Sequence, residues 1–196
     1  MLGPMPDRPL RIFTIGHSNR RLSQLMELLL GNQVRLVADV RSSPASKRLP
    51  HFEKEALAGE LRRAGIEYAH LPGLGGRRQP AAQSVNQGWR NASFRGYADY
   101  MQTDAFRSSL AELLELAAGR QTAIMCAEAV PWRCHRSLVA DALLAAGVDV
   151  CDIIGRQPPR PHRLTPFGLV QGSEVTYPGA GSSARRPDAG SIRSPK

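Results

Sequence analysis

Residues 122–154 read TAIMC AEAVPWRCHR SLVADALLAA GVDVCDII. The runs 122–126 and 148–154 are short and apolar and contain β-branched residues, as is typical of buried strands. Between them, residues 137–146 form a longer apolar run that Gly147 can end, which favours a helix. A strand, a helix and a second strand in this order predict a right-handed crossover between two parallel strands.

The same alternation recurs on the N-terminal side of this stretch. Further strands are predicted at residues 11–16, 36–40 and 66–71, and further helices at 22–30, 53–64 and 103–118. Residues 79–95 show no clear period and are expected to form a long loop. Strands that alternate with helices predict an α/β fold, here a single three-layer domain with a mostly parallel sheet of about five strands and helices on both faces.

The chain is expected to have three segments: a flexible N-terminus (residues 1–10), the α/β domain (11–154) and a tail (155–196). Pro, Gly, Ser and Arg dominate the tail, which has few large apolar residues, so we expect it to be largely disordered. Seven of the 26 basic residues and two of the 17 acidic residues lie in the tail, which therefore carries +5 of the net charge of +9.

Composition limits the class of protein. With 42% hydrophobic and 22% charged residues, the chain has the composition of an ordinary soluble domain. No apolar run approaches the roughly 20 residues that span a bilayer, and the N-terminus lacks a secretory signal, so we expect a cytoplasmic protein with no membrane association. Three cysteines, Cys126, Cys134 and Cys151, are an odd number, and we expect reduced thiols rather than a disulfide framework.

Chemically reactive side chains follow the carboxyl ends of four predicted strands. They lie in residues 17–18, 39–48, 70–78 and 126–136. In an open parallel sheet, ligands bind in the crevice beyond the carboxyl ends of the strands. Loops that are far apart in the sequence are therefore expected to converge on one crevice.

Five short segments of the sequence match motifs of a known family. They are TIGHS at 14–18, DVRS at 39–42, HLPGLGG at 70–76, FRGYA at 94–98 and CAEAVPWRCHR at 126–136. In these segments and in their order, the chain resembles the bacterial and archaeal family known as domain of unknown function 488. The resemblance covers residues 11–154 and implies an α/β domain with an active or binding crevice, without implying a reaction.

The segment after residue 126 favours an anionic ligand. A loop that enters a helix N-terminus offers backbone N–H groups, and Arg133 and Arg136 add charge-assisted donors. The competing interpretation of Arg136 is a surface ion pair with Glu128 or Asp141. The expected ligand is an anionic small molecule or a nucleotide. Beside the two arginines, the residues expected to bind it are Ser18, Asp39, Arg41, Arg48, His70, Arg77, Arg95, Tyr97, Trp132 and His135.

Three groups are candidates for catalysis: Cys126, His17 and Glu128. A thiol at the end of a buried strand, near a helix N-terminus and guanidinium groups, has a lowered pKa and a larger thiolate fraction. The spacing from Cys126 to Arg133 differs from that of cysteine phosphatases, and a buried inert cysteine is the competing interpretation. His17 and Glu128 could act as general acids or bases, although His17 could instead cap the first helix.

Two other functions are compatible with the sequence: metal binding and nucleic-acid binding. Thiolates and imidazole bind zinc, so Cys126, Cys134 and His135 are a possible metal site, and no other cofactor is predicted. Aromatic residues such as Trp89 and Trp132 interleave with arginines, which suits base stacking, so nucleic acid could bind through the crevice and the basic tail. The leading hypothesis is an enzyme or enzyme-derived domain that acts on an anionic ligand. The alternatives are a noncatalytic nucleotide- or nucleic-acid-binding module and a metal-binding protein.

Overall fold

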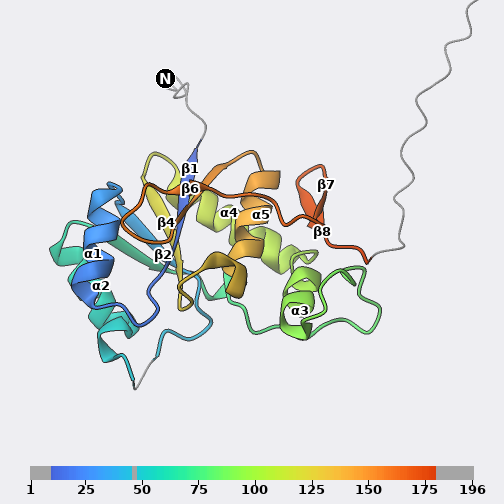
Figure 1. Cartoon of the computed structure of the whole chain (residues 1–196), viewed down its shortest axis with the longest axis horizontal. Helices are drawn as coiled ribbons and strands as arrows, with labels where there is room; N and C mark the ends of the chain where they lie inside the picture. The colour runs from blue at the N-terminus through green and yellow to red at the C-terminus, as the bar shows by residue number, and fades with distance from the viewer. Residues whose placement is uncertain (1–9, 46–47, 180–196) are drawn as a thin grey trace, which may run out of the picture.

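A computed structural model of the chain describes residues 10–45 and 48–179. It has a mixed α/β fold in which helices cover both faces of a six-stranded sheet (Figure 1). The strands of this sheet are β1 (Arg11–Gly16), β2 (Leu36–Asp39), β3 (Glu67–His70), β4 (Thr122–Cys126), β5 (Asp149–Ile153) and β6 (Arg160–Pro161). The α-helices are α1 (Leu22–Gly31), α2 (Lys54–Arg63), α3 (Ala92–Tyr100), α4 (Asp104–Ala117) and α5 (Arg136–Ala145). Residues 1–9 and 180–196, which belong to the predicted N-terminal segment and tail, lie outside the described residues.

The strand order is β3-β2-β4-β1-β5-β6, with β1 to β5 parallel and β6 antiparallel to β5. β4 therefore lies between β1 and β2, although it is the fourth strand in the chain. Cys126 at the end of β4 pairs in register with Gly16, and Asp39 pairs with His70. The loops after β2, β3 and β4 consequently leave the same edge of the sheet, as the sequence predicted.

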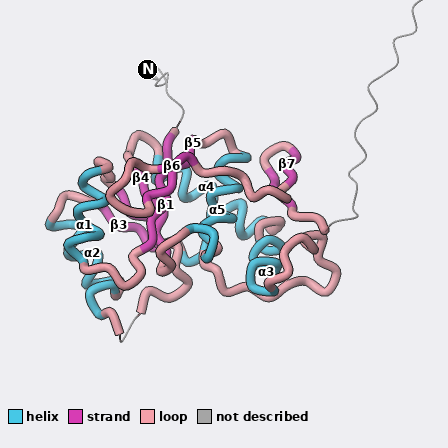
Figure 2. Tube along the Cα trace, viewed as in Figure 1, coloured by secondary structure: helices cyan, strands magenta, loops and turns pink. Residues whose placement is uncertain are grey.

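Two clusters of buried apolar side chains fill the two faces of the sheet. Successive side chains of a strand point to opposite faces, so Ile12 of β1 joins the cluster under α3, α4 and α5, while Phe13 joins the cluster under α1 and α2. Figure 2 shows the strands between these two groups of helices. Within the part of the chain that the structure describes, no helix is long and apolar enough to cross a bilayer.

The C-terminal segment 155–179 is folded, and the expectation that residues 155–196 are largely disordered is wrong for this part. It contains β6 and the antiparallel pair β7 (Leu169–Gln171) and β8 (Glu174–Thr176). Eight residues of α5 are buried, and a helix that is buried all round needs cover on more than one side. Val175 and Tyr177 provide part of that cover, because they belong to the same core as Leu138 and Leu143.

The expectation of a loop over residues 79–95 is also partly wrong, because α3 begins at Ala92. The Asn91 side chain accepts hydrogen bonds from the backbone N–H groups of Ser93 (2.8 Å) and Phe94 (3.3 Å), which is the usual way to start a helix. The helix has only nine residues, and glycine, which disfavours helices, stands at its centre. The cap at Asn91 was the available sequence signal.

Candidate functional site

A cavity of about 330 Å³ opens beyond the carboxyl ends of β2, β3 and β4. We call it the cysteine cavity. The loops after these three strands and the start of α3 supply its walls. Its lining residues are Arg41, Ser42, Ser43, Gly76, Arg77, Ser93, Phe94, Cys126, Ala127, Glu128, Arg133, Cys134 and His135.

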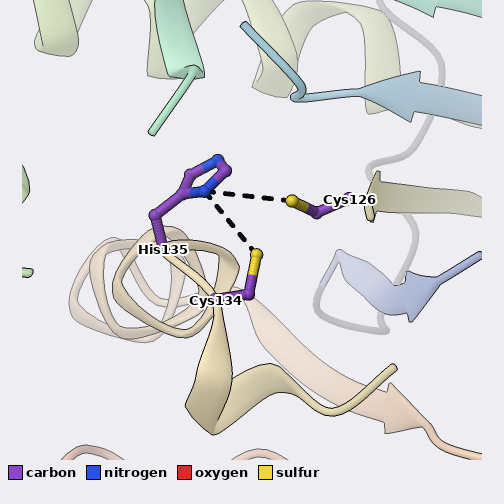
Figure 3. A group of neighbouring side chains, drawn as sticks. All are labelled: Cys126, Cys134 and His135. Atoms are coloured by element: carbon purple, nitrogen blue, oxygen red, sulfur yellow. Dashed lines mark hydrogen bonds between the residues drawn. The ribbon is translucent and has the colours of Figure 1, made fainter. Parts of the chain in front are cut away.

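Two thiols and one imidazole of the cavity lining lie close together, as Figure 3 shows for Cys126, Cys134 and His135. Cys126 ends β4, whereas Cys134 and His135 directly precede α5. His135 Nδ1 lies 3.9 Å from Cys126 Sγ and 3.6 Å from Cys134 Sγ. The three atoms lie within 4.8 Å of one another, and both cysteines are buried. We refer to these three residues as the Cys–Cys–His cluster.

The orientation of the His135 ring is set by its surroundings. Its Nε2 lies 3.1 Å from the carbonyl oxygen of Val40, and because a carbonyl only accepts, Nε2 carries the hydrogen. In the neutral ring, Nδ1 is then a free acceptor that faces the two thiols. The ring packs against Tyr97, and a Cβ atom at Gly76 would lie 2.3 Å from Nδ1. Glycine at position 76 therefore permits a close approach of backbone to imidazole.

A fully buried arginine lies next to the cluster. The backbone N–H of Arg136 points to Cys134 Sγ at 3.5 Å, and its guanidinium Nη1 donates to the carbonyl oxygen of Glu128 at 3.1 Å. Its Nε and Nη2 have no hydrogen-bond partner among the described residues, and none of these supplies it with a carboxylate. A buried charge without a counter-charge is strongly destabilising. The competing interpretation, a surface ion pair with Glu128 or Asp141, is therefore wrong for the part of the chain that the structure describes, and the buried cation needs a nearby anion.

The pKa values of the two thiols are shifted in opposite directions. A hydrogen bond from Cys134 lowers the pKa of Cys126 well below the ordinary range, against the effect of burial. The hydrogen bond to His135 and the charge of Arg136 act in the same direction as the Cys134 hydrogen bond. The hydrogen bond to Cys126 and burial raise the pKa of Cys134. These shifts favour the thiolate form of Cys126, which lies close to the Arg136 guanidinium.

Asp39 and Arg41 form a buried ion pair beside the cavity. Asp39 Oδ1 accepts from Arg41 Nε at 2.8 Å, and Oδ2 accepts from Nη2 at 2.5 Å. Arg41 Nη1 donates to the carbonyl oxygen of Phe52 at 2.9 Å, and the Tyr68 hydroxyl donates to Asp39 at 2.7 Å. Arg41 therefore lines the cavity with a guanidinium that is already engaged.

His17 belongs to this ion-pair network. Its Nε2 accepts from Arg41 Nη1 at 3.2 Å, and its Nδ1 donates to the carbonyl oxygen of Ser18 at 2.9 Å. Burial and the charge of Arg41 lower the pKa of His17, so the ring is neutral at physiological pH. Both ring nitrogens have partners and His17 does not line the cysteine cavity, so the geometry favours a structural role over the acid–base role expected from the sequence.

The family model described as "Domain of unknown function DUF488" matches residues 21–143. The chain belongs to this family. The match confirms the resemblance seen in the sequence, and it includes every residue that lines the cysteine cavity of this DUF488 protein. The segment 155–179 lies beyond the match. Comparison with the curated proteins and with the solved structures returned no match for the chain.

The DUF488 fold brings seven of the predicted site residues to the cysteine cavity. They are Arg41, Arg77, Cys126, Glu128, Arg133, Cys134 and His135. Sequence reasoning did not select the other six lining residues, which are Ser42, Ser43, Gly76, Ser93, Phe94 and Ala127. Of these, Ser93 and Phe94 were missed because the start of α3 was interpreted as a loop.

The other predicted residues lie elsewhere in this DUF488 chain. Ser18 lines a separate hollow beside α1, His70 donates to the carbonyl oxygen of Arg41, and Arg95 donates to the carbonyl oxygen of Trp89. Tyr97 is fully buried and its hydroxyl donates to the carbonyl oxygen of Leu74.

The remaining three predicted residues are arginines or aromatics outside the cavity lining. Arg48 is exposed, Arg136 is buried below the thiols, and Trp132 lines a second cavity. A long side chain can point into the cysteine cavity or away from it, and the spacing of residues in the sequence does not show which. The sequence therefore could not exclude these three residues from the cavity lining.

Proposed function

We propose that this protein is an enzyme that acts on an anionic substrate in the cysteine cavity, with Cys126 as a thiolate nucleophile. The main support is the buried guanidinium of Arg136, which lacks a carboxylate partner among the described residues and lies next to two thiols. A thiolate is the attacking form of cysteine, and a nearby cation favours it. In the first step a bond forms from Cys126 Sγ to the substrate, and the leaving group departs with the electrons of the bond that breaks.

The neighbouring groups suit this reaction. His135 Nδ1 faces Cys126 Sγ as a hydrogen-bond acceptor for the protonated thiol, and the Cys134 thiol donates to the thiolate form. Glu128 lines the cavity with an exposed side chain, so it is the remaining candidate for proton transfer to the leaving group.

Two arginines make the cavity attractive to anions. Arg77 and Arg133 line it, their residues are exposed, and neither forms an ion pair within the described ranges 10–45 and 48–179. Unpaired guanidinium groups bind carboxylates and phosphates through charge-assisted hydrogen bonds. The substrate is therefore expected to carry its negative charge close to the electrophilic atom.

Alkylation with paired reagents tests both parts of this proposal. At pH 6 an ordinary thiol is less than about 1% ionised, so rapid modification of Cys126 at this pH would reveal its thiolate. We expect iodoacetate, which carries a carboxylate, to react about tenfold faster than neutral iodoacetamide, relative to the same ratio for a small free thiol. Mass spectrometry identifies the modified residue, and Cys151, whose pKa is raised by burial, is the internal control.

Variants separate the thiolate from the anion site. Arg77→Gln and Arg133→Gln should remove the preference for iodoacetate while leaving the reaction with iodoacetamide at pH 6. Arg107→Gln changes an exposed arginine on α4, away from the cavity, and serves as the matched control. If Cys126 reacts at pH 6 no faster than Cys151, or shows no preference for the anionic reagent, the proposal is wrong.

A soft divalent metal such as zinc is the second candidate for the Cys–Cys–His cluster. The donor atoms lie within 4.8 Å of one another, and the bond from His135 Nε2 to a backbone carbonyl is typical of metal-bound histidines. However, two thiolates would neutralise a divalent ion and leave the Arg136 charge without a counter-charge. Charge balance therefore favours a metal-free cluster with one thiolate over a divalent ion bound by two thiolates.

Elemental analysis of the protein purified without added metal separates these two candidates. We expect far less than one zinc, iron or copper ion per chain, with no change in Cys126→Ser. A stoichiometry near one that is lost in both Cys126→Ser and His135→Ala would instead establish a metal site and exclude a free nucleophile.

A further inference from the structure

A second cavity, of about 720 Å³, is built largely by the C-terminal segment 155–179. We call it the aromatic cavity. Consecutive residues line the two cavities: Trp132 lines the aromatic cavity, and Arg133 lines the cysteine cavity. Its volume falls within the range of small-molecule sites, roughly 300–1,000 Å³.

Aromatic rings form much of the wall of this cavity. Trp89 and Phe167 meet edge to face with ring centroids 4.9 Å apart. Trp132 is 63% exposed and Phe167 is 39% exposed. Large aromatic side chains at a concave, solvent-accessible surface are a common sign of a binding site, and their flat faces suit stacking on a planar ligand.

The aromatic cavity also carries uncompensated positive charge. Arg160 and Arg163 line it, both are exposed, and neither takes part in an ion pair in the part of the chain that the structure describes. The acidic residue of the lining, Asp152, is already bound by Thr14 at 2.7 Å and by His162 at 2.9 Å. The charge that remains available in this cavity is therefore cationic.

We propose that the aromatic cavity binds a mononucleotide. The base stacks on Trp132 and Phe167, and the phosphate pairs with Arg160 and Arg163. Stacking on aromatic side chains accepts any base, and guanidinium groups bind phosphate through paired hydrogen bonds. A nucleic-acid strand needs a basic groove that follows several phosphates, whereas these two arginines border one cavity of limited volume. This proposal does not depend on the chemistry of Cys126.

Tryptophan fluorescence gives a direct readout, because both tryptophans of the chain line this cavity. We expect AMP, GMP, CMP and UMP to quench the emission saturably. Adenosine, which lacks the phosphate, should bind about tenfold more weakly, and ribose 5-phosphate, which lacks the base, should cause no quenching.

Variants locate the bound nucleotide. Phe167→Leu and Arg163→Gln should each weaken AMP binding about tenfold, and circular dichroism should show that both variants remain folded. Arg107→Gln, outside both cavities, should bind AMP like the unmodified chain.

Three results would overturn the proposal. The first is the absence of saturable quenching by all four mononucleotides. The second is weaker AMP binding in Arg77→Gln together with unchanged binding in Arg163→Gln, which would place the nucleotide in the cysteine cavity. The third is binding of a single-stranded oligonucleotide more than tenfold tighter than AMP, which would indicate a nucleic-acid site.

Discussion

Replacing His162 with glutamine is expected to lower the free energy of unfolding by about 3–5 kcal/mol. The His162 ring lies between two buried carboxylates, with Nδ1 2.9 Å from Asp152 and Nε2 3.2 Å from Asp141. The same Asp141 accepts from the Tyr177 hydroxyl at 2.7 Å and from the Thr165 backbone N–H at 3.1 Å. Loss of the imidazolium would leave two carboxylates without a buried counter-charge and loosen the segment 155–179 from α5.

The contribution of His162 should depend on pH. Although burial acts in the opposite direction, hydrogen bonds and charge from Asp141 and Asp152 raise the pKa of His162 to about 9 from its usual 6.5. A group with a raised pKa in the folded state contributes fully below its unfolded pKa and loses that contribution as the pH rises through the folded value. The unmodified chain should therefore lose stability between pH 6.5 and 9.

Urea unfolding at a series of pH values measures both effects of His162→Gln. The variant should be less stable at pH 6.5 and should lack most of the decrease toward pH 9. His51→Gln is the matched control, because its Nε2 has no partner among the described residues. Equal pH profiles for the unmodified chain and His162→Gln would contradict the assignment of an imidazolium between two carboxylates.

Replacing Asp39 with asparagine should also destabilise the fold by about 3–5 kcal/mol. Asp39 is fully buried, and its carboxylate holds the buried guanidinium of Arg41 through both oxygens. Asparagine has nearly the same shape but no charge, so the cation of Arg41 would remain buried without compensation. Asp39, which the sequence analysis expected to bind the ligand, does not line the cysteine cavity and instead holds Arg41 in place.

A double variant distinguishes lost charge pairing from lost shape. In Asp39→Asn/Arg41→Met the buried cation is also removed, and we expect most of the lost stability to return, since a buried ion pair is often replaceable by apolar residues of similar volume. Urea unfolding of the four proteins of this cycle gives the coupling energy. Additive losses in the two single variants and the double variant would show that the ion pair does not account for the effect.

The strands and helices of this protein follow from local sequence signals. The predicted strand 122–126 has the observed bounds of β4, and the predicted helix that starts at Thr103 corresponds to α4, where the Thr103 side chain caps the first turn. The spacing of apolar residues and the glycines that end helices are signals that extend over only a few residues. They can therefore be recognised without knowledge of the rest of the chain. Short elements, such as α3 with nine residues and β6 with two, were missed because their local signals are brief.

The edge of the sheet at which candidate residues gather could also be predicted from the sequence. The side chains of Cys126, His135, Arg77 and Arg133 come together there because parallel strands end at one edge of the sheet. This conclusion needed only the alternation of strands and helices along the chain.

Other features depend on contacts between distant segments. The insertion of β4 between β1 and β2 places Cys126 beside Gly16, while α5 buries Arg136 next to the thiols instead of exposing it to a surface carboxylate. The segment 155–179 folds because Asp141 of α5 binds His162 and Tyr177. Burial and charge pairing arise only when these segments pack together. The sequence therefore determined most of the strands and helices and the edge of the sheet at which the candidate residues gather, whereas tertiary packing decided which of these residues are buried or paired and created the second cavity.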